Sequence, residues 1–302
     1  MRKILLLGFL LIGGIILAYQ AFAQVSIGIS PLVFELTGNP GDVIENQIKI
    51  YNPSDNTIGI KMTVEDISPS DEAGHVIVEP AETETYSLAR WVNAEPAEFP
   101  LQPKEERWVK FTISVPKNAE PGGHYGTVIA GIGAVAGGEV TGATISPRVG
   151  VLILLTVPGE MKENLTVKDF SVPLFSEHGP INFSILFRNE GSVHLKPRGL
   201  ITISNWLGQK VADVSFSEKN VLPGAIRKFE TSWNKKWLWA GKYTATLTGS
   251  YGISNTFLTP TVITFWAFPW KFGLGILIVI ILFILSRKRW LAAFRIMIKG
   301  ER

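Results

Sequence analysis

Residues Trp108-Val-Lys-Phe-Thr-Ile-Ser-Val115 decide the fold class of this 302-residue chain. Apolar side chains at Val109, Phe111, Ile113 and Val115 alternate with polar ones. This period of two predicts a half-buried strand of an antiparallel sheet. Similar short runs lie at 48–51, 58–64, 127–132, 181–187, 200–204, 211–216, 227–233 and 243–248, and a continuous apolar run typical of a central strand lies at 149–157. Because no convincing amphipathic helix lies among them, we expect an all-β protein.

Three short motifs occur in the same order in both halves of the chain. They are a strand ending at asparagine and a turn (Ile50-Tyr-Asn-Pro-Ser-Asp55, Phe187-Arg-Asn-Glu-Gly-Ser192), a proline before a strand (Pro103, Pro223) and a Gly-x-Tyr sequence (Gly123-His-Tyr125, Gly241-Lys-Tyr243). In a β-sandwich, a tyrosine near the start of a late strand can bond back to the preceding corner. We therefore expect two immunoglobulin-like β-sandwich domains, at 24–160 and 161–260, joined near Pro158-Gly-Glu160.

The N-terminus has the order of charged, apolar and small residues that marks a secretory signal peptide. Met1-Arg2-Lys3 precedes an apolar run, and Ala21-Phe-Ala23 precedes Gln24. We expect residues 1–23 to be a signal peptide cleaved after Ala23, and an uncleaved anchor is the alternative.

A second apolar stretch at 265–286 predicts a transmembrane α-helix. About 20 helical residues can cross a hydrocarbon core of about 30 Å, and the alternative is a buried core helix. Trp266, Trp270 and Lys271 would lie at the outer membrane interface.

The residues after this stretch are basic, beginning with Arg287, Lys288 and Arg289. The positive-inside rule therefore makes 287–302 a cytoplasmic tail and places the rest of the chain outside a cell membrane that it crosses once.

Charge and cysteine content exclude several classes of function. Residues 24–160 hold 8 Lys and Arg against 18 Asp and Glu, whereas residues 161–270 hold 12 against 7. The acidic outer domain argues against nucleic-acid binding, and the basic second domain suits a position above anionic lipid or wall polymer. The chain has no cysteine, which excludes disulfides, thiol catalysis and cysteine zinc sites and fits a bacterial envelope protein.

The chain resembles the WxL-interacting proteins of bacterial cell surfaces in its signal peptide, two domains, single span and basic tail. The matching stretches are Ser26-Ile-Gly-Ile-Ser-Pro-Leu-Val33, Asn39-Pro-Gly-Asp-Val43, Tyr51-Asn-Pro-Ser-Asp55 and Pro121-Gly-Gly-His-Tyr-Gly126. The resemblance implies that the first domain binds peptidoglycan and that the second binds a protein, either a WxL surface protein or a host ligand. The matching residues are mostly turn formers, so they carry over the fold and no ligand site.

No pattern in the sequence points to catalysis, a cofactor or a metal, and we expect the protein not to be an enzyme. The four histidines are scattered, and the nucleophile and phosphate-binding motifs are absent. The acidic segment from Asp66 to Glu98 could gather calcium, but its wide spacing favours a solvated inserted loop.

Two surfaces are candidates for binding. Trp233, Trp237 and Trp239 share strand parity and are interleaved with Lys235 and Lys236, so exposed rings could stack on sugars or lie among lipid headgroups, although tryptophan is also a common core residue.

The second candidate surface is the run of small apolar residues that includes Thr127, Val128, Ile129 and Ile132. At a sheet edge it could accept a partner strand, and the alternative is a packed inner hairpin.

These features predict a membrane-anchored extracellular adaptor that contacts peptidoglycan or cell-surface proteins. The alternative is a chaperone-like surface assembly factor that acts by β-strand exchange.

Overall fold

The computed structural model describes residues 26–79, 86–133 and 147–299, with side chains described as far as Arg287. The expected signal peptide lies outside the described residues. Contacts divide the chain into two units. Unit 1 comprises the described residues of Met1–Ser68 and Val78–Glu160, and unit 2 those of Pro69–Ile77 and Met161–Arg302. Along the main chain the division falls between Glu160 and Met161, where the sequence placed the domain boundary.

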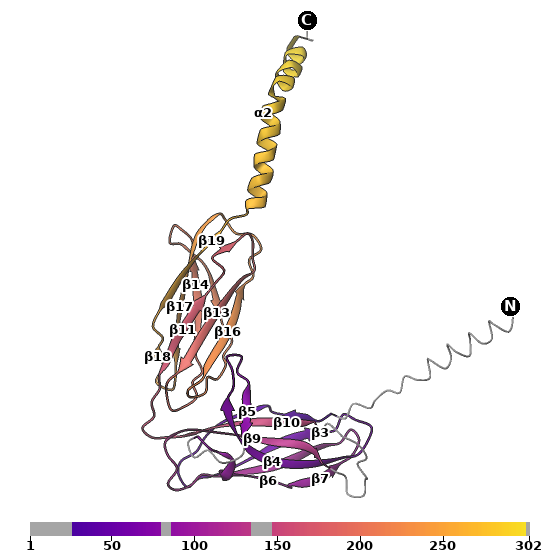
Figure 1. The fold of residues 1–302 in the computed structure, drawn as a ribbon, viewed down its shortest axis with the longest axis vertical. Helices are drawn as coiled ribbons and strands as arrows, with labels where there is room; N and C mark the ends of the chain where they lie inside the picture. The colour runs from indigo at the N-terminus through magenta and orange to yellow at the C-terminus, as the bar shows by residue number, and fades with distance from the viewer. Residues whose placement is uncertain (1–25, 80–85, 134–146, 300–302) are drawn as a thin grey trace, which may run out of the picture. The chain divides into compact units, whose positions relative to one another are not determined.

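Unit 1 is a sandwich of two β-sheets (Figure 1). In spatial order, the first sheet contains β1 (Gly28–Ser30), β3 (Val43–Tyr51), β8 (Glu106–Ser114) and β6 (Val92–Glu95). The second contains β2 (Val33–Thr37), β10 (Arg148–Val157), β9 (Gly122–Gly133), β4 (Ile58–Pro69) and β5 (Val76–Glu79), with β7 (Glu98–Leu101) also paired to β4. The alternation in β8 is confirmed, because Val109, Phe111 and Ile113 are fully buried in the core.

Unit 2 has the same construction. One sheet contains β11 (Leu165–Ser171), β13 (Ile181–Asn189) and β16 (Ile226–Trp233). The other contains β12 (Phe175–Ser176), β19 (Thr261–Ala267), β17 (Gly241–Tyr251), β14 (Arg198–Ser204) and β15 (Lys210–Ser215), with β18 (Thr256–Phe257) beside β17. Its core is rich in phenylalanine, with several edge-to-face ring contacts.

In each unit the first strand is divided between the two sheets. β1 pairs antiparallel with β3, and β2 then pairs parallel with β10. In the same way, β11 pairs antiparallel with β13, and β12 pairs parallel with β19. A strand that changes sheets cannot cover the whole edge of either one, so each sheet keeps a partly open edge on this side.

The repeated asparagine has one structural role in both units. Asn52 and Asn189 are both fully buried. The Asn52 side-chain amide donates to the carbonyls of Asn56, Leu101 and Gln102, and its Oδ1 accepts the Ser54 N–H. The Asn189 amide donates to the carbonyls of Val193 and Val221, and its Oδ1 accepts the Gly191 N–H. Each side chain thus ties a strand end to a carbonyl two positions before the repeated proline.

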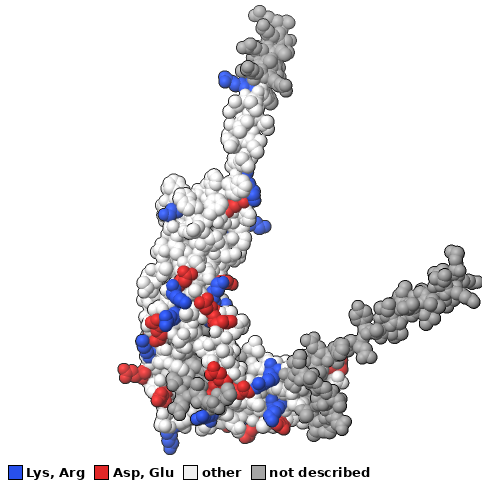
Figure 2. All heavy atoms as spheres, in the orientation of Figure 1, with Lys and Arg blue, Asp and Glu red and all other residues white. Residues whose placement is uncertain are grey.

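The apolar stretch near the C-terminus contains a strand and a helix, so the expected boundaries at 260 and 265 are wrong. β19 completes the unit 2 sheet, and its Phe265 is fully buried and stacks on Tyr243. The helix α2 begins at Trp270 and runs to Lys299. Among the described residues it is the one helix long and apolar enough to cross a membrane, over Trp270–Arg287. No charged residue lies between Lys271 and Arg287, and Figure 2 shows this part of α2 as a white surface.

Candidate functional site: an open strand edge and an aromatic end

The run that could accept a partner strand at a sheet edge lies instead in the sheet interior, which agrees with the alternative interpretation of a packed inner strand. Figure 1 shows β9 between β10 and β4. Thr127 pairs with both Glu65 and Leu152, Val128 with Val64 and Val151, and Ile129 with Thr63 and Gly150; all three are buried. The half-buried Ile132 pairs with Ile60 and donates its N–H to the Pro147 carbonyl. With both sides paired, β9 cannot accept another strand.

An open edge of this sheet lies on β10, the next strand. β10 pairs with β9 along its whole length from Arg148 to Val157, whereas β2 covers only Leu152–Thr156. The four residues before Leu152 therefore have a strand partner on one side only among the described residues. The local sequence does not show this, because 149–157 reads as a continuously buried strand.

The register shows which backbone groups face this open side. The Leu152 N–H donates toward β2, to the Leu32 carbonyl, at 3.0 Å. Because N–H and C=O groups alternate between the two sides of a strand, those of Arg148 and Gly150 face the same side as those of Leu152, beyond the start of β2. The Arg148 guanidinium bonds to Glu65 and Thr63 of β4 and so extends across the sheet, away from the open edge.

Apolar side chains at this end of unit 1 are incompletely covered. Val149 on β10 and Ile29 on β1 are half-buried and pack against the core, and β1 contacts β10. The neighbouring Val151 is fully buried. A strand placed beside β10 would meet both backbone donors and acceptors and the edge of an apolar core.

The structure separates the three tryptophans that the sequence grouped. Trp233 is buried in the unit 2 core, edge to face with Tyr243, and Lys235 lies over its ring. β16 ends at Trp233, so strand parity does not extend to Trp237 and Trp239, which are 73% and 84% exposed. Lys236 lines a pocket with Trp237 and the start of α2.

Tyr243 holds the aromatic loop that precedes β17. Its hydroxyl donates to the Trp239 carbonyl at 3.0 Å, which is the corner bond expected from the Gly-x-Tyr motif. Burial raises the pKa of the Tyr243 hydroxyl, and the bond to Trp239 partly offsets this shift. The hydroxyl therefore stays protonated, and able to donate, at neutral pH.

Replacing Tyr243 with phenylalanine should lower the free energy of unfolding of unit 2 by about 1 kcal/mol, because the Trp239 carbonyl loses its donor while the ring packing is kept. Amide exchange in the loop 234–240 should become faster. The control is Tyr251→Phe at the other end of β17, where the described residues show no hydroxyl bond. Equal effects at both positions would contradict the corner role.

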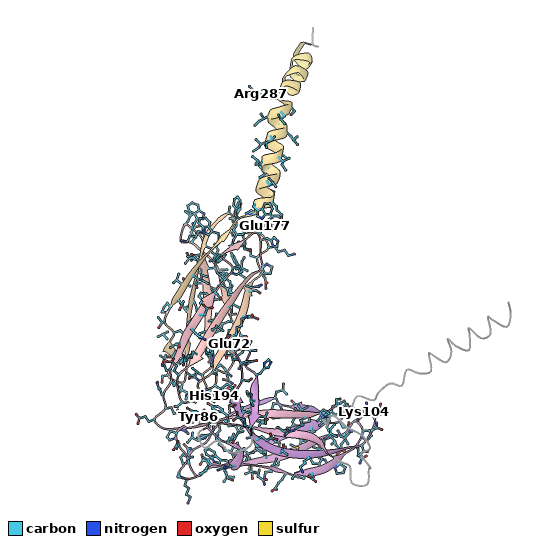
Figure 3. All side chains as sticks on the ribbon, in the orientation of Figure 1. Glu72, Tyr86, Lys104, Glu177, His194 and Arg287 are labelled. Atoms are coloured by element: carbon cyan, nitrogen blue, oxygen red, sulfur yellow. The ribbon has the colours of Figure 1, made fainter. Side chains whose placement is uncertain are left out.

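The residues expected at the membrane interface occupy two different elements. Trp266 is exposed on β19, and Trp270 is exposed at the start of α2. Lys271 has a protein partner, since its ammonium lies 2.9 Å from the Glu177 carboxylate. Figure 3 shows Glu177 beside the start of α2 and Arg287 much farther along the helix. The side chains of Lys288 and Arg289 lie outside those described.

The acidic segment is not one solvated loop, which corrects that expectation. Its described part includes the end of β4, β5, the 3₁₀ turn η1 (Ala89–Trp91), β6 and the first residue of β7. Asp66 is 2% exposed and accepts bonds from the Ser87 hydroxyl and from the N–H groups of Leu88 and Ala89. Within the described residues, no group of three or more histidine, aspartate or glutamate side chains is placed to hold a metal ion.

No protein-family model and no curated protein matches the sequence. Solved structures that the comparison finds similar to this chain include the class 5 fimbriae chaperone CfaA, at 13% identity and TM-score 0.40, covering 80% of this chain and 99% of that one. A chain from a chaperone–tip adhesin complex of CFA/I fimbriae has 11% identity, TM-score 0.41 and coverage of 80% and 98%. A chain from the Salmonella enterica SafA pilin–SafB chaperone complex has 11% identity, TM-score 0.39 and coverage of 80% and 98%. Identities this low do not assign a function.

Proposed function

We propose that the protein is a membrane-tethered, chaperone-like binding protein that takes up a polypeptide segment by adding it as a strand to β10 of unit 1. The observation that carries this proposal is the stretch Arg148–Val151, which is paired with β9 and left uncovered by β2. Outward-facing backbone groups bind any extended polypeptide, and alternate side chains of that polypeptide select what fits.

The residues along this edge suit the binding of another strand and do not block it. Natural sheets block their edges with charges, prolines or bulges that keep other strands away. Here Gly150 presents no side chain, and the single charged side chain, Arg148, is held by Glu65. Val149 and Ile29 give an incoming strand apolar contacts on its inner face.

The tether in this proposal is α2. Its first 18 residues have a mean hydropathy of 2.0, and their side chains are not buried against the rest of the protein. A helix of this length and polarity suits the hydrocarbon core of a bilayer, and Arg287 at its end fits a cytoplasmic C-terminus.

Hydrogen exchange on the full chain in lipid nanodiscs tests the strand-addition site. The probes are nine-residue synthetic peptides in which valine alternates with threonine, with lysine at both ends. A bound peptide should protect the amides of Arg148 and Gly150, while Val149 and Val151, already paired with β9, should change little. Failure of every such peptide to protect Arg148 or Gly150 would refute the proposal, and protection at Thr264 of β19 instead would place the site in unit 2.

Proline at position 148 should weaken peptide binding about fivefold, because it removes one outward N–H donor. Position 148 is the first residue of β10, where a sheet edge accepts proline. The matched control is Arg148→Ala, which also loses the ion pair to Glu65 but keeps the N–H. Equal affinity of the two variants would show that the backbone donor at 148 is not used.

Binding of peptidoglycan stays a prediction from the sequence. Sedimentation of the full chain in detergent with purified peptidoglycan tests it separately from the strand edge.

A further inference from the structure

One end of unit 2 gathers most of the tryptophans of the chain. Five of the nine, namely Trp206, Trp237, Trp239, Trp266 and Trp270, are exposed there. They lie in the β14–β15 turn, the β16–β17 loop, the end of β19 and the start of α2. We call this surface the aromatic end.

Strand registers place these segments together. Ser204 at the end of β14 pairs with Thr244 near the start of β17, and Gly241 pairs with Ala267 at the end of β19. A Cβ atom at Gly241 would lie 2.8 Å from the Trp206 ring, so the two loops are in contact. Phe175 of β12 pairs with Trp266, and Leu174, also exposed, accepts the Trp266 N–H through its carbonyl.

The charge at the aromatic end is positive. Its loops and strand ends, residues 172–180, 204–210, 233–242 and 264–271, hold the single carboxylate Glu177 and the lysines Lys210, Lys235, Lys236, Lys242 and Lys271. In Figure 2 this end is largely white, with scattered blue and some red beside the start of α2. Exposed tryptophan with lysine is the composition of protein surfaces at the bilayer interface, where the rings lie among the headgroups and the ammonium groups meet anionic phosphate.

The chain connection leaves this end close to any membrane that α2 crosses. Only Phe268 and Pro269 separate the last residue of β19 from the first of α2. Three Cα–Cα steps span at most about 11 Å, comparable to the headgroup layer that adds several ångströms on each side of the hydrocarbon core. The Lys271–Glu177 ion pair also joins the first turn of α2 to the sandwich.

A pocket of about 530 Å³ lies at this junction. Trp237 and Phe272 supply apolar walls, and Lys236 and Lys271 lie among its lining residues beside Glu177. Its mostly apolar lining with two ammonium groups suits part of a lipid with its phosphate.

We infer that the aromatic end of unit 2 docks on the outer leaflet of the bilayer, with its tryptophans in the interface and its lysines against anionic lipid headgroups. The inference rests on the membrane tether of the proposed function and adds a second, protein-surface contact with the same membrane. Docking fixes unit 2 against the membrane, where a tether alone would leave it free to tilt.

Nitroxide labelling tests this inference on the full chain, which is free of native cysteine. A single cysteine replaces Trp239, or Phe257 as the control; these side chains are 84% and 86% exposed and lie at opposite ends of β17. A third label replaces Val279, in the middle of the apolar part of α2. In nanodiscs of phosphatidylcholine with phosphatidylglycerol, collisions with oxygen and with a water-soluble nickel chelate report the depth of each label.

The label at 239 should be shielded from nickel and accessible to oxygen, and the label at 257 should be fully accessible to nickel. Equal nickel access at 239 and 257, with 279 inside the bilayer, would overturn the inference and leave the tether intact. Nickel access at 279 would overturn both. Two other outcomes would also overturn the inference. Shielding at 239 that requires added peptidoglycan would assign the surface to wall polymer, and shielding that increases with the number of chains per disc would assign it to a second copy of the chain. Leu174→Cys repeats the measurement without removing a tryptophan.

Charge reversal separates lipid electrostatics from apolar contact. Lys235→Glu with Lys236→Glu should shift the docked-to-undocked ratio at position 239 by about 25-fold or more in anionic discs. The matched control is Lys162→Glu with Lys168→Glu, two exposed lysines near the start of unit 2. The same shift in both double variants would overturn the assignment of headgroup contact to the aromatic end.

Discussion

Replacing Asp66 with alanine should lower the free energy of unfolding of unit 1 by about 3–5 kcal/mol, because two buried N–H groups and a hydroxyl lose a charged acceptor. One carboxylate oxygen accepts the Leu88 and Ala89 N–H groups at 3.0 and 2.8 Å, and the other accepts the Ser87 hydroxyl. The first N–H groups of a helical turn have no partner within the turn, and no side chain of the turn itself caps η1. Asp66, 22 residues earlier on β4, supplies that cap.

Asparagine at position 66 should restore most of this stability. Its single carbonyl oxygen can accept both N–H groups, and its amide can donate to the Ser87 hydroxyl, which can rotate to accept. The variant loses only the extra strength of charged hydrogen bonds, about 1 kcal/mol. Native-state hydrogen exchange of the full chain in detergent measures each unit separately. The surface control is Glu98→Ala, whose partner Lys61 is also mostly exposed and whose loss should cost under about 1 kcal/mol.

The Asp66→Ala and Asp66→Asn variants also test whether Asp66 is a structural carboxylate or a calcium ligand. A calcium site at Asp66 would weaken in both variants, and added calcium chloride would stabilise the wild-type protein but not Asp66→Asn. We expect calcium chloride to leave the exchange rates of all three proteins unchanged.

The fold class could be predicted because its main signal is local. Burial of one strand face imposes a period of two on neighbouring residues, and Val109, Phe111 and Ile113 show that period without reference to any partner strand. The motif that contains the repeated asparagines Asn52 and Asn189 could also be recognised from neighbouring residues alone. The sequence did not reveal that their side chains bond to carbonyls near distant prolines.

The location of the open edge could not be predicted because edges depend on pairings between distant segments. Both β9 and β10 contain long apolar runs, and the pairing of β4 with β9 and the short reach of β2 decide which of the two strands is open. The tryptophans show a second limit. Parity places Trp233 and Trp237 on one face only if the strand continues between them, and it ends at Trp233.

Hydropathy alone also misplaced the start of the helix. Residues 261–285 are apolar almost throughout, but Phe265 is buried by the sandwich and Leu274 is exposed on α2. The change from strand to helix coincides with Phe268-Pro269, and proline is common at the start of a helix. The aromatic end was missed for a related reason, because Trp206 and Trp239 come together only through the pairing of β14 with β17.

Alanine at Asn189 should lower the free energy of unfolding of unit 2 by about 2–4 kcal/mol, and alanine at Asn52 should do the same to unit 1. Each substitution removes a buried side-chain amide that donates to two or three carbonyls, and it leaves the N–H group of Ser54 or Gly191 without its acceptor. Native-state exchange should show faster core amides only in the unit that carries the change, because each unit has its own core.

The control is Asn182→Ala, an exposed asparagine on the same strand as Asn189, which should change stability by less than about 0.5 kcal/mol. Aspartate at 189 should destabilise unit 2 more than alanine does, because its charge would face the carbonyls of Val193 and Val221. If Asn189→Ala instead raised the exchange rates of core amides equally in both units, the two sandwiches would unfold together. The bonds of Asn52 and Asn189 would then stabilise the whole chain and not only the unit that contains each of them.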